Sequence, residues 1–184
     1  MGTDADNLNA RYAHCVQFFD EDARLVEAVS HFVRESIESA CTCLSISTAE
    51  HRTAIDSTLQ SAGVDVASLI GQYRYVPLDA HALLSTFLVD GRLDRERFHS
   101  NMDQLMRQVT ARGEPVRIFG EMVALLLATE QPHAALQLEE LWNELSRQHD
   151  FQLLCAYPSR EVEHDDRLRM LICAVHSSVL GEPH

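Results

Sequence analysis

The chain has 184 residues, a formal net charge of −13 and a sequence pI near 5.1. This length is enough for one domain with a proper core, and the acidic balance excludes a stand-alone nucleic-acid-binding protein, because phosphate neutralisation requires basic clusters. All fifteen basic residues are arginine, which excludes Schiff-base chemistry and a phosphate-loop lysine. We expect a disordered segment over residues 1–10 and a single domain over residues 11–184.

In the first half of the chain, strand-like runs alternate with amphipathic helices. His14 to Phe19 reads as a strand, and the acidic run that follows it begins a helix with Leu25, Val29, Phe32, Val33 and Ile37 at helical spacing. The next predicted elements are a strand over 41–47, a helix over 49–62 that Gly63 ends, a short helix over 66–70, a strand over 73–78 and a helix that Asp79 caps.

The second half continues the same alternation. A turn over 89–91 precedes a helix that begins at Asp94 and closes at Gly113. A strand over 116–119 then leads through two helical segments to a strand over 151–156, which is the length of crossover that parallel strands require. A last helix is predicted over 166–179.

This alternation predicts an α/β fold, a three-layer sandwich with a mostly parallel central sheet of about five strands. Ligands of such sheets bind beyond the carboxyl ends of the strands. We therefore expect a pocket lined by the dipeptides that follow four strands, Ser47-Thr48, Leu78-Asp79, Gly120-Glu121 and Ala156-Tyr157.

No apolar run is long enough to cross a bilayer, and the opening MGTDADNLNA lacks a signal-peptide pattern, so a cytoplasmic location is expected. Five cysteines are present, and three lie in apolar strand-like runs. Cys41 and Cys43 share a strand face, but no second pair stands at zinc-ribbon spacing. This pattern favours reduced, packed thiols over a metal or redox site, and no cofactor is expected.

Glu121 is the first candidate site residue, because a carboxylate after a strand and Gly120 is placed to orient a polar ligand, bind a cation or accept a proton. The alternative is that Glu121 caps the helix beginning at Met122. His14 could reach the same cavity and, with Glu121 or a cysteine, ligate a metal, or it could simply bond to backbone. Trp142 shares an apolar helical stripe, which favours core packing over ligand stacking.

A long ordered signature carries a family resemblance. The run VRIFGEMVALLLATEQPHAALQLEELWNELSRQHDFQLLCAYP, the opening HCVQFFDED, STAEHRTAI and the DGRLDRERF turn resemble the methanogen/methylotroph, DcmR-like (MEDS) sensory domain over about residues 12 to 158. The closing ICAVHSSV resembles the segment that often follows this domain. The resemblance implies a sensory module of bacterial and archaeal signalling proteins, with a RecA/KaiC-like α/β fold.

The implied fold relationship raises the hypothesis of an ATPase. The turn after the 41–47 strand, where a RecA-like ATPase would have its phosphate loop, has no glycine and contains Glu50, so ATP hydrolysis is not expected. Weak nucleotide binding through Arg52 and Thr53 stays open.

The preferred function is a non-catalytic sensory module that binds a small organic molecule and signals through a protein partner, such as a histidine kinase or a transcription regulator, without direct nucleic-acid or membrane binding. A homodimer through the late helices is a further possibility. The alternatives are a divergent enzyme or a metal- or nucleotide-binding protein that uses Glu121 and His14, and a scaffold with no small ligand. No G-x-S-x-G or H-E-x-x-H motif supports an enzyme. The predicted ligand-binding residues are His14, Phe18, Thr48, His51, Asp79, Glu121 and Tyr157.

Overall fold

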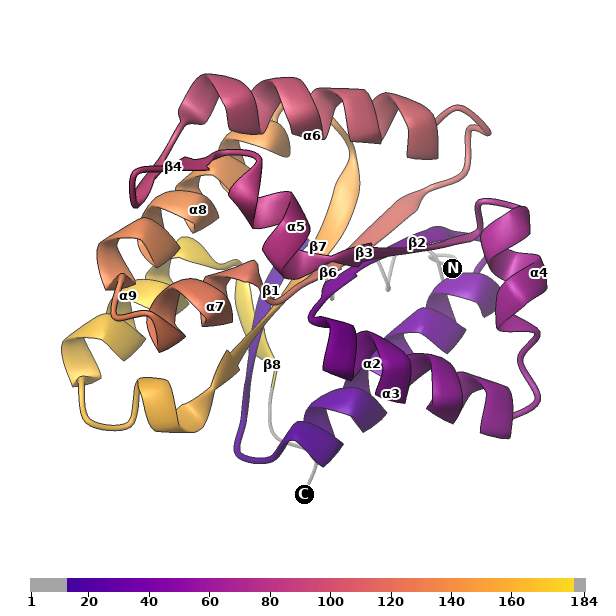
Figure 1. Ribbon diagram of the computed structural model, residues 1–184, viewed down its shortest axis with the longest axis horizontal. Helices are drawn as coiled ribbons and strands as arrows, with labels where there is room; N and C mark the ends of the chain where they lie inside the picture. The colour runs from indigo at the N-terminus through magenta and orange to yellow at the C-terminus, as the bar shows by residue number, and fades with distance from the viewer. Residues whose placement is uncertain (1–12, 181–184) are drawn as a thin grey trace, which may run out of the picture.

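A six-stranded parallel sheet forms the centre of the protein (Figure 1). The computed structural model describes residues 13–180, so the expected disorder over residues 1–10 lies outside the described residues. Every neighbouring pair in this sheet is parallel, which confirms the predicted α/β class. From edge to edge the strands are β3 (Tyr75–Asp79), β2 (Thr42–Ser47), β6 (Val116–Gly120), β7 (Phe151–Pro158), β1 (His14–Phe19) and β8 (Ser178–Leu180).

Helices cover both faces of the sheet and produce the predicted three layers (Figure 1). One face packs against the helices that follow β1 and β2, namely α2 (Asp22–Glu38), α3 (Ala49–Ser61) and α4 (Val66–Gly71). The other face packs against the later helices, namely α5 (Ala80–Ser85), α6 (Arg95–Val109), α7 (Met122–Ala128), α8 (Pro132–Leu145) and α9 (Asp166–Val175). A 3₁₀ turn, η1 (Ser159–Glu161), follows β7.

Short polar side chains begin most of these helices. A capping side chain accepts a bond from a backbone N–H of the first turn in α3, α4, α5, α6 and α9, and the caps are Thr48, Asp65, Asp79, Asp94 and Asp165. Gly113, with a φ of 77°, follows α6 in the left-handed region, where a side chain would be strained. These local signals explain why the helix starts were readable in the sequence.

The sheet differs from the prediction at the end of the described chain. The predicted helix over 166–179 ends at Val175, and the following residues form β8, which raises the number of strands from five to six. The Ser177 hydroxyl accepts a hydrogen bond from the His14 backbone N–H at 2.9 Å and donates one to the His14 carbonyl at 2.8 Å. Pairing with β1 therefore outcompetes the helical pattern of this segment.

The predicted turn over 89–91 joins two short antiparallel strands, β4 (Leu88–Val89) and β5 (Arg92–Leu93). Asp90 and Gly91 both have positive φ, 50° and 72°, which is the conformation that tight hairpins require.

The larger core cluster includes Trp142, which is 1% exposed, so the core reading of this residue is confirmed. All five cysteines are free thiols, and four of them are buried. Burial raises the pKa of the Cys43 thiol to about 12, as expected for packed, unreactive cysteine. Among residues 13–180 no helix has both the length and the apolar character needed to span a bilayer.

Candidate functional site

The carboxyl ends of β2 and β6 lie side by side at a point where the chain connections diverge. From β2 the chain passes through α3 and α4 to the edge strand β3, whereas from β6 it passes through α7 and α8 to β7 on the opposite side. Such divergence opens a crevice above the strand ends in parallel sheets. Thr48 and Glu121 directly follow these two strands, so the fold places both predicted residues at this switch point of the sheet.

The Glu121 side chain joins the end of β6 to the start of α3. One carboxylate oxygen accepts a hydrogen bond from the Thr48 backbone N–H, and the other lies 2.7 Å from Nδ1 of His51. Glu121 occupies the N-cap position of α7, as the alternative interpretation expected, but its side chain makes no cap bond there and bonds to the start of α3 instead. Only 2% of Glu121 is exposed, and its charge is matched by a helix start and an imidazole.

His51 continues this contact toward the surface. Its Nε2 atom lies 3.7 Å from the Asp22 carboxylate at the start of α2, so that His51 stands between a buried and an exposed acid. The hydrogen bond that His51 makes to the Glu121 carboxylate raises the pKa of His51, whereas burial alone would lower it. We name Glu121, His51 and Thr48 the switch-point cluster.

The raised pKa of His51 predicts a pH-dependent stability. The cluster stabilises the fold fully below the unfolded-state pKa of about 6.5, and this contribution is lost as the pH rises through the higher folded-state pKa. Unfolding free energies from urea titrations should therefore show a gap between wild type and His51→Asn that is widest in mild acid and narrows in mild alkali. His31→Asn, at a side chain that is 65% exposed, is the control. A gap that does not change with pH would contradict this assignment.

Asp79 follows β3 and begins α5, where its carboxylate accepts a bond from the Ala82 N–H at 2.9 Å. The same carboxylate faces Arg52 of α3 at 3.8 Å. Asp79 thus lies on the predicted edge of the sheet, next to α3, with a capping role that its position alone explains.

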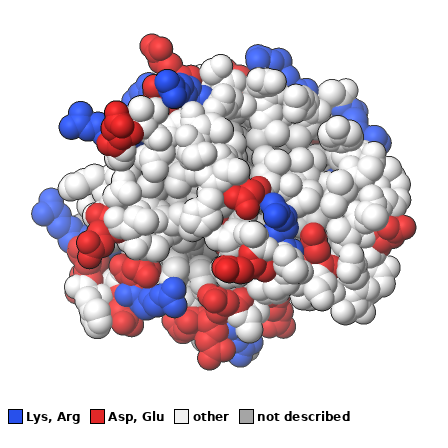
Figure 2. Space-filling view, in the orientation of Figure 1, with Lys and Arg blue, Asp and Glu red and all other residues white. Residues whose placement is uncertain are grey.

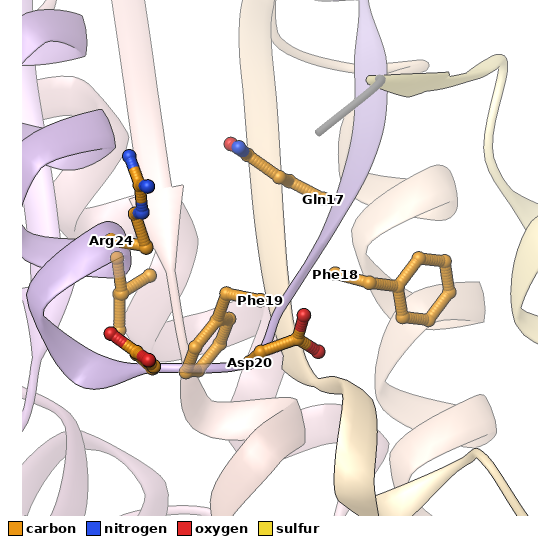
Figure 3. A pocket seen from close by; sticks show the side chains of 7 residues that line it. Gln17, Phe18, Phe19, Asp20 and Arg24 are labelled. Atoms are coloured by element: carbon orange, nitrogen blue, oxygen red, sulfur yellow. The ribbon is translucent and has the colours of Figure 1, made fainter. Parts of the chain in front are cut away.

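A pocket of about 250 Å³ opens at the carboxyl end of β1, where the helices that follow β1 and β7 lie on opposite faces of the sheet (Figure 3). In Figure 3 the Gln17 and Phe18 side chains leave β1 in opposite directions, and Gln17 extends toward the side on which Arg24 lies. The pocket combines aromatic and charged groups, and its lining consists of Gln17, Phe18, Phe19, Asp20, Glu21, Arg24 and Leu25.

Acidic side chains gather in the lower part of the face in Figure 2, over the region where α2 begins. A more open groove of about 520 Å³ lies between α2 and α3, with Asp22, Glu50 and His51 among its lining residues. Of the seven predicted ligand-binding residues, Phe18 therefore lines the pocket and His51 lines the groove.

A second polar cluster is buried under α8, and the sequence prediction did not assemble it. Glu139 of α8 is fully buried and lies 3.1 Å from Nε2 of His14 and 3.3 Å from Nε2 of His176. The Tyr157 hydroxyl donates to Glu139 Oε1, the oxygen that faces His176, at 2.6 Å. The Cys155 thiol donates to Oε2, the oxygen that faces His14, at 3.4 Å. We name His14, Glu139, Cys155 and His176 the Glu139 cluster.

Electrostatics tie this cluster together. Burial alone would raise the pKa of Glu139, but the hydrogen bonds and charges of His14 and His176 lower it well below the usual value. Burial lowers the pKa of His176, yet Glu139 reverses that effect and the net pKa is raised. Burial and the Glu139 charge raise the pKa of both Cys155 and Tyr157. Glu139 thus contributes to the pKa shifts of His176, Cys155 and Tyr157.

The predicted residues fall into separate groups. Thr48, His51 and Glu121 lie together, and His14 and Tyr157 lie together around Glu139. His14 stands opposite Leu153, at the level of Ile118, with β7 between it and β6. The expected pairing of His14 with Glu121 is therefore wrong, whereas the expected proximity of His14 to a cysteine is correct, since Cys155 Sγ lies 3.7 Å from Nε2. The His14 ring contacts side chains, which also rules out the purely backbone-bonded alternative.

Glu139 and His176 were missed as site residues. The sequence did contain a signal for Glu139, because this acid follows Leu138 on the apolar stripe of α8. A charged side chain on such a stripe becomes buried and requires a polar partner. His176 had no comparable signal, because its place depends on the chain leaving α9 at Val175.

Comparisons with known proteins agree with this architecture. A family model described as "MEthanogen/methylotroph, DcmR Sensory domain" matches residues 13–176, a range that begins beside His14 and ends at His176. No curated protein matches the chain. A solved structure from Pyrococcus horikoshii OT3, titled as a structural study, is similar with a TM-score of 0.52 and 12% identity, over 92% of this chain and 81% of that one, which supports the fold alone. The chain belongs to the methanogen/methylotroph, DcmR sensory (MEDS) domain family.

Proposed function

We propose that this protein is a non-catalytic regulatory module that binds a small organic molecule in the pocket at the carboxyl end of β1. The observation that carries the proposal is the lining of that pocket in a member of a sensory family. Phe19 and Leu25 offer apolar surface, whereas Gln17 and Arg24 offer hydrogen-bond donors, which is the combination expected of a small-molecule site.

The position of the pocket supports a signalling role. Its rim residue Glu21 precedes Asp22, which faces His51, and His51 contacts Glu121 at the end of β6. A ligand that shifts the start of α2 would change the Asp22–His51 distance and, through it, the contact between α3 and the sheet. Ligand binding biases a conformation only through such differential contacts.

The alternative of a divergent enzyme has less support. It relied on Glu121 acting with His14, and these two side chains lie in different clusters. Both Glu121 carboxylate oxygens already accept bonds from Thr48 and His51, which fits a connecting role better than that of a free general base.

The pocket predicts a ligand contact at Arg24. A panel of short alcohols, carboxylic acids, amines and nucleotides, tested by thermal shift and then by calorimetry, should include a compound that binds wild type without being consumed. We expect Arg24→Met to weaken that binding by about 10- to 100-fold, since a bond to a charged group is worth about 1.5–3 kcal/mol.

Arg34→Met, at an exposed position of the same helix, is the matched control and should bind the compound as wild type does. Equal binding by both variants would remove the pocket from the proposal, and turnover of the compound would favour the enzyme.

A partner is needed for output, and we propose a signalling protein such as a histidine kinase or a transcription regulator. Exposed apolar side chains on the α9 and β8 side support a docking role, namely Met170, Leu171 and Val179. Light scattering of the purified protein distinguishes this arrangement from the alternative, a homodimer through α9.

A further inference from the structure

We propose that the Glu139 cluster binds one divalent transition-metal ion of the zinc type, with His14 Nε2, Glu139, Cys155 Sγ and His176 Nε2 as its four ligands. The four ligand atoms all lie within 4.8 Å of one another, and all four residues are buried. Imidazole, thiolate and carboxylate are the ligand types that zinc takes in proteins.

The spacing of three of the ligand atoms is close to one face of a tetrahedron around such an ion. Zinc–nitrogen and zinc–oxygen distances of about 2.0–2.1 Å and a zinc–sulfur distance of about 2.3 Å give edges of about 3.3–3.6 Å between ligands. Three observed edges form one face of such a tetrahedron, with 3.1 Å from His14 Nε2 to Glu139 Oε2, 3.4 Å from Cys155 Sγ to the same oxygen and 3.7 Å from Cys155 Sγ to His14 Nε2. His176 Nε2 lies 3.3 Å from the other Glu139 oxygen and within 4.8 Å of the remaining ligand atoms, so the His176 ring would move toward this face to seat the ion.

Both histidines are already oriented for metal binding. Nδ1 of His176 lies 2.7 Å from the Ile172 carbonyl, so Nδ1 carries the proton and Nε2 faces the cluster. Nδ1 of His14 lies 2.8 Å from the Asn143 side-chain oxygen, and the Asn143 amide group donates to the Val175 carbonyl at 2.9 Å, which fixes that oxygen as the acceptor. Metal-binding histidines characteristically donate their other ring proton to such a partner.

The charges also balance. One carboxylate and one thiolate supply two negative charges, which neutralise a divalent cation between two neutral imidazoles, and a neutral assembly is the arrangement a buried site favours. Binding releases the Cys155 thiol proton to solvent. The competing arrangement is a purely protonic network, in which imidazolium groups and the thiol donate to Glu139.

The origin of the ligands indicates what the ion would do. His14 comes from β1, Cys155 from β7, Glu139 from α8, and His176 from the residue after α9. Four protein ligands close the coordination sphere, which is typical of structural rather than catalytic zinc. The ion would hold the α9–β8 segment against the centre of the sheet, and this role is independent of the pocket after β1.

Cobalt substitution tests the proposal directly. The full chain, purified without a polyhistidine tag and treated with chelator, is titrated with Co²⁺ and then with Zn²⁺. We expect one equivalent of Co²⁺ to produce the intense visible bands of tetrahedral cobalt and a thiolate-to-cobalt charge-transfer band, and Zn²⁺ to displace both. A weak, octahedral-type spectrum, or the lack of a thiolate band, would overturn the proposal even if every variant failed to fold.

Paired variants assign the ligands. Cys155→Ser should lose the charge-transfer band, whereas Cys173→Ser, at the partly buried cysteine of α9, should retain it. His176→Gln should lower Co²⁺ affinity by more than about 100-fold, whereas His164→Gln, at a side chain that is 90% exposed, should not. Unchanged spectra and affinities in Cys155→Ser and His176→Gln would show that the metal binds elsewhere, and would refute the assignment.

Tyr157→Phe gives a graded readout. Its hydroxyl contacts Glu139 and none of the other three ligands by hydrogen bond. Its removal should weaken Co²⁺ binding by about 10- to 100-fold and leave the tetrahedral spectrum in place. Wild-type affinity in this folded variant would argue against Glu139 as a ligand.

Discussion

Replacing Glu139 by leucine is expected to lower the free energy of unfolding by about 3–5 kcal/mol, because the change leaves a set of buried polar groups without their shared acceptor. The Tyr157 hydroxyl at 2.6 Å and the Cys155 thiol at 3.4 Å both lose the carboxylate, and His14 and His176 lose the acid that their Nε2 atoms face. Urea titrations followed by circular dichroism, with a chelator present, measure this loss without any contribution from bound metal.

The neighbouring residue supplies the matched control. Glu140 lies on the exposed side of the same helix, so Glu140→Leu should change the free energy of unfolding by no more than about 0.5 kcal/mol. Both titrations are then repeated with Zn²⁺ present, which separates the role of Glu139 as a hydrogen-bond acceptor from its proposed role as a metal ligand. Only a protein that keeps the metal ligands gains stability from the ion. Equal stability of the two leucine variants would mean that Glu139 does not organise the buried cluster.

Truncating Trp142 to alanine is the second change with a large expected effect, also about 3–5 kcal/mol. The Trp142 ring is 1% exposed and meets Phe98 of α6 edge-on, with ring centroids 5.5 Å apart, and Phe151 of β7 at 6.1 Å. Its removal leaves a cavity where two helices meet the sheet, and the aromatic contacts are lost with it.

Trp142 is the single tryptophan of the chain, so the unfolding of Trp142→Ala has to be followed by circular dichroism rather than by fluorescence. Leu171→Ala is a suitable reference, because Leu171 is 38% exposed and its truncation should cost about 0.5 kcal/mol or less. Similar losses in the two variants would show that the α6–α8–sheet contact is less tightly packed than these distances indicate.

Sequence patterns predicted the fold well because its signals are local. Helix starts followed from single capping residues such as Thr48, Asp79 and Asp94, each of which accepts the expected backbone N–H. The crossover from β6 to β7 required parallel pairing, and the two strands are paired in parallel. The end of the described chain was misread because β8 depends on a partner, β1, that lies far away in sequence.

The candidate sites were only partly predictable, for a related reason. The strand-end rule placed Thr48 and Glu121 correctly, since each follows a strand whose end is visible in the sequence. It could not show that His51 would meet Glu121, because that contact joins residues 70 positions apart in the sequence. The strand-end rule placed Tyr157 at the same edge, but the Tyr157 hydroxyl points into the core and donates to Glu139. The alternation of residues along a strand does not predict how deeply a side chain is buried.

The placement of β1 has a consequence for how the protein is made. β1 pairs with β7 on one side and β8 on the other, and the contact between His14 and Ser177 spans 163 positions. The ribosome therefore synthesises β1 long before either of its neighbouring strands, and the apolar β1 segment stays unpaired in the meantime. Such an arrangement favours slow completion of the sheet and binding of the nascent chain by chaperones.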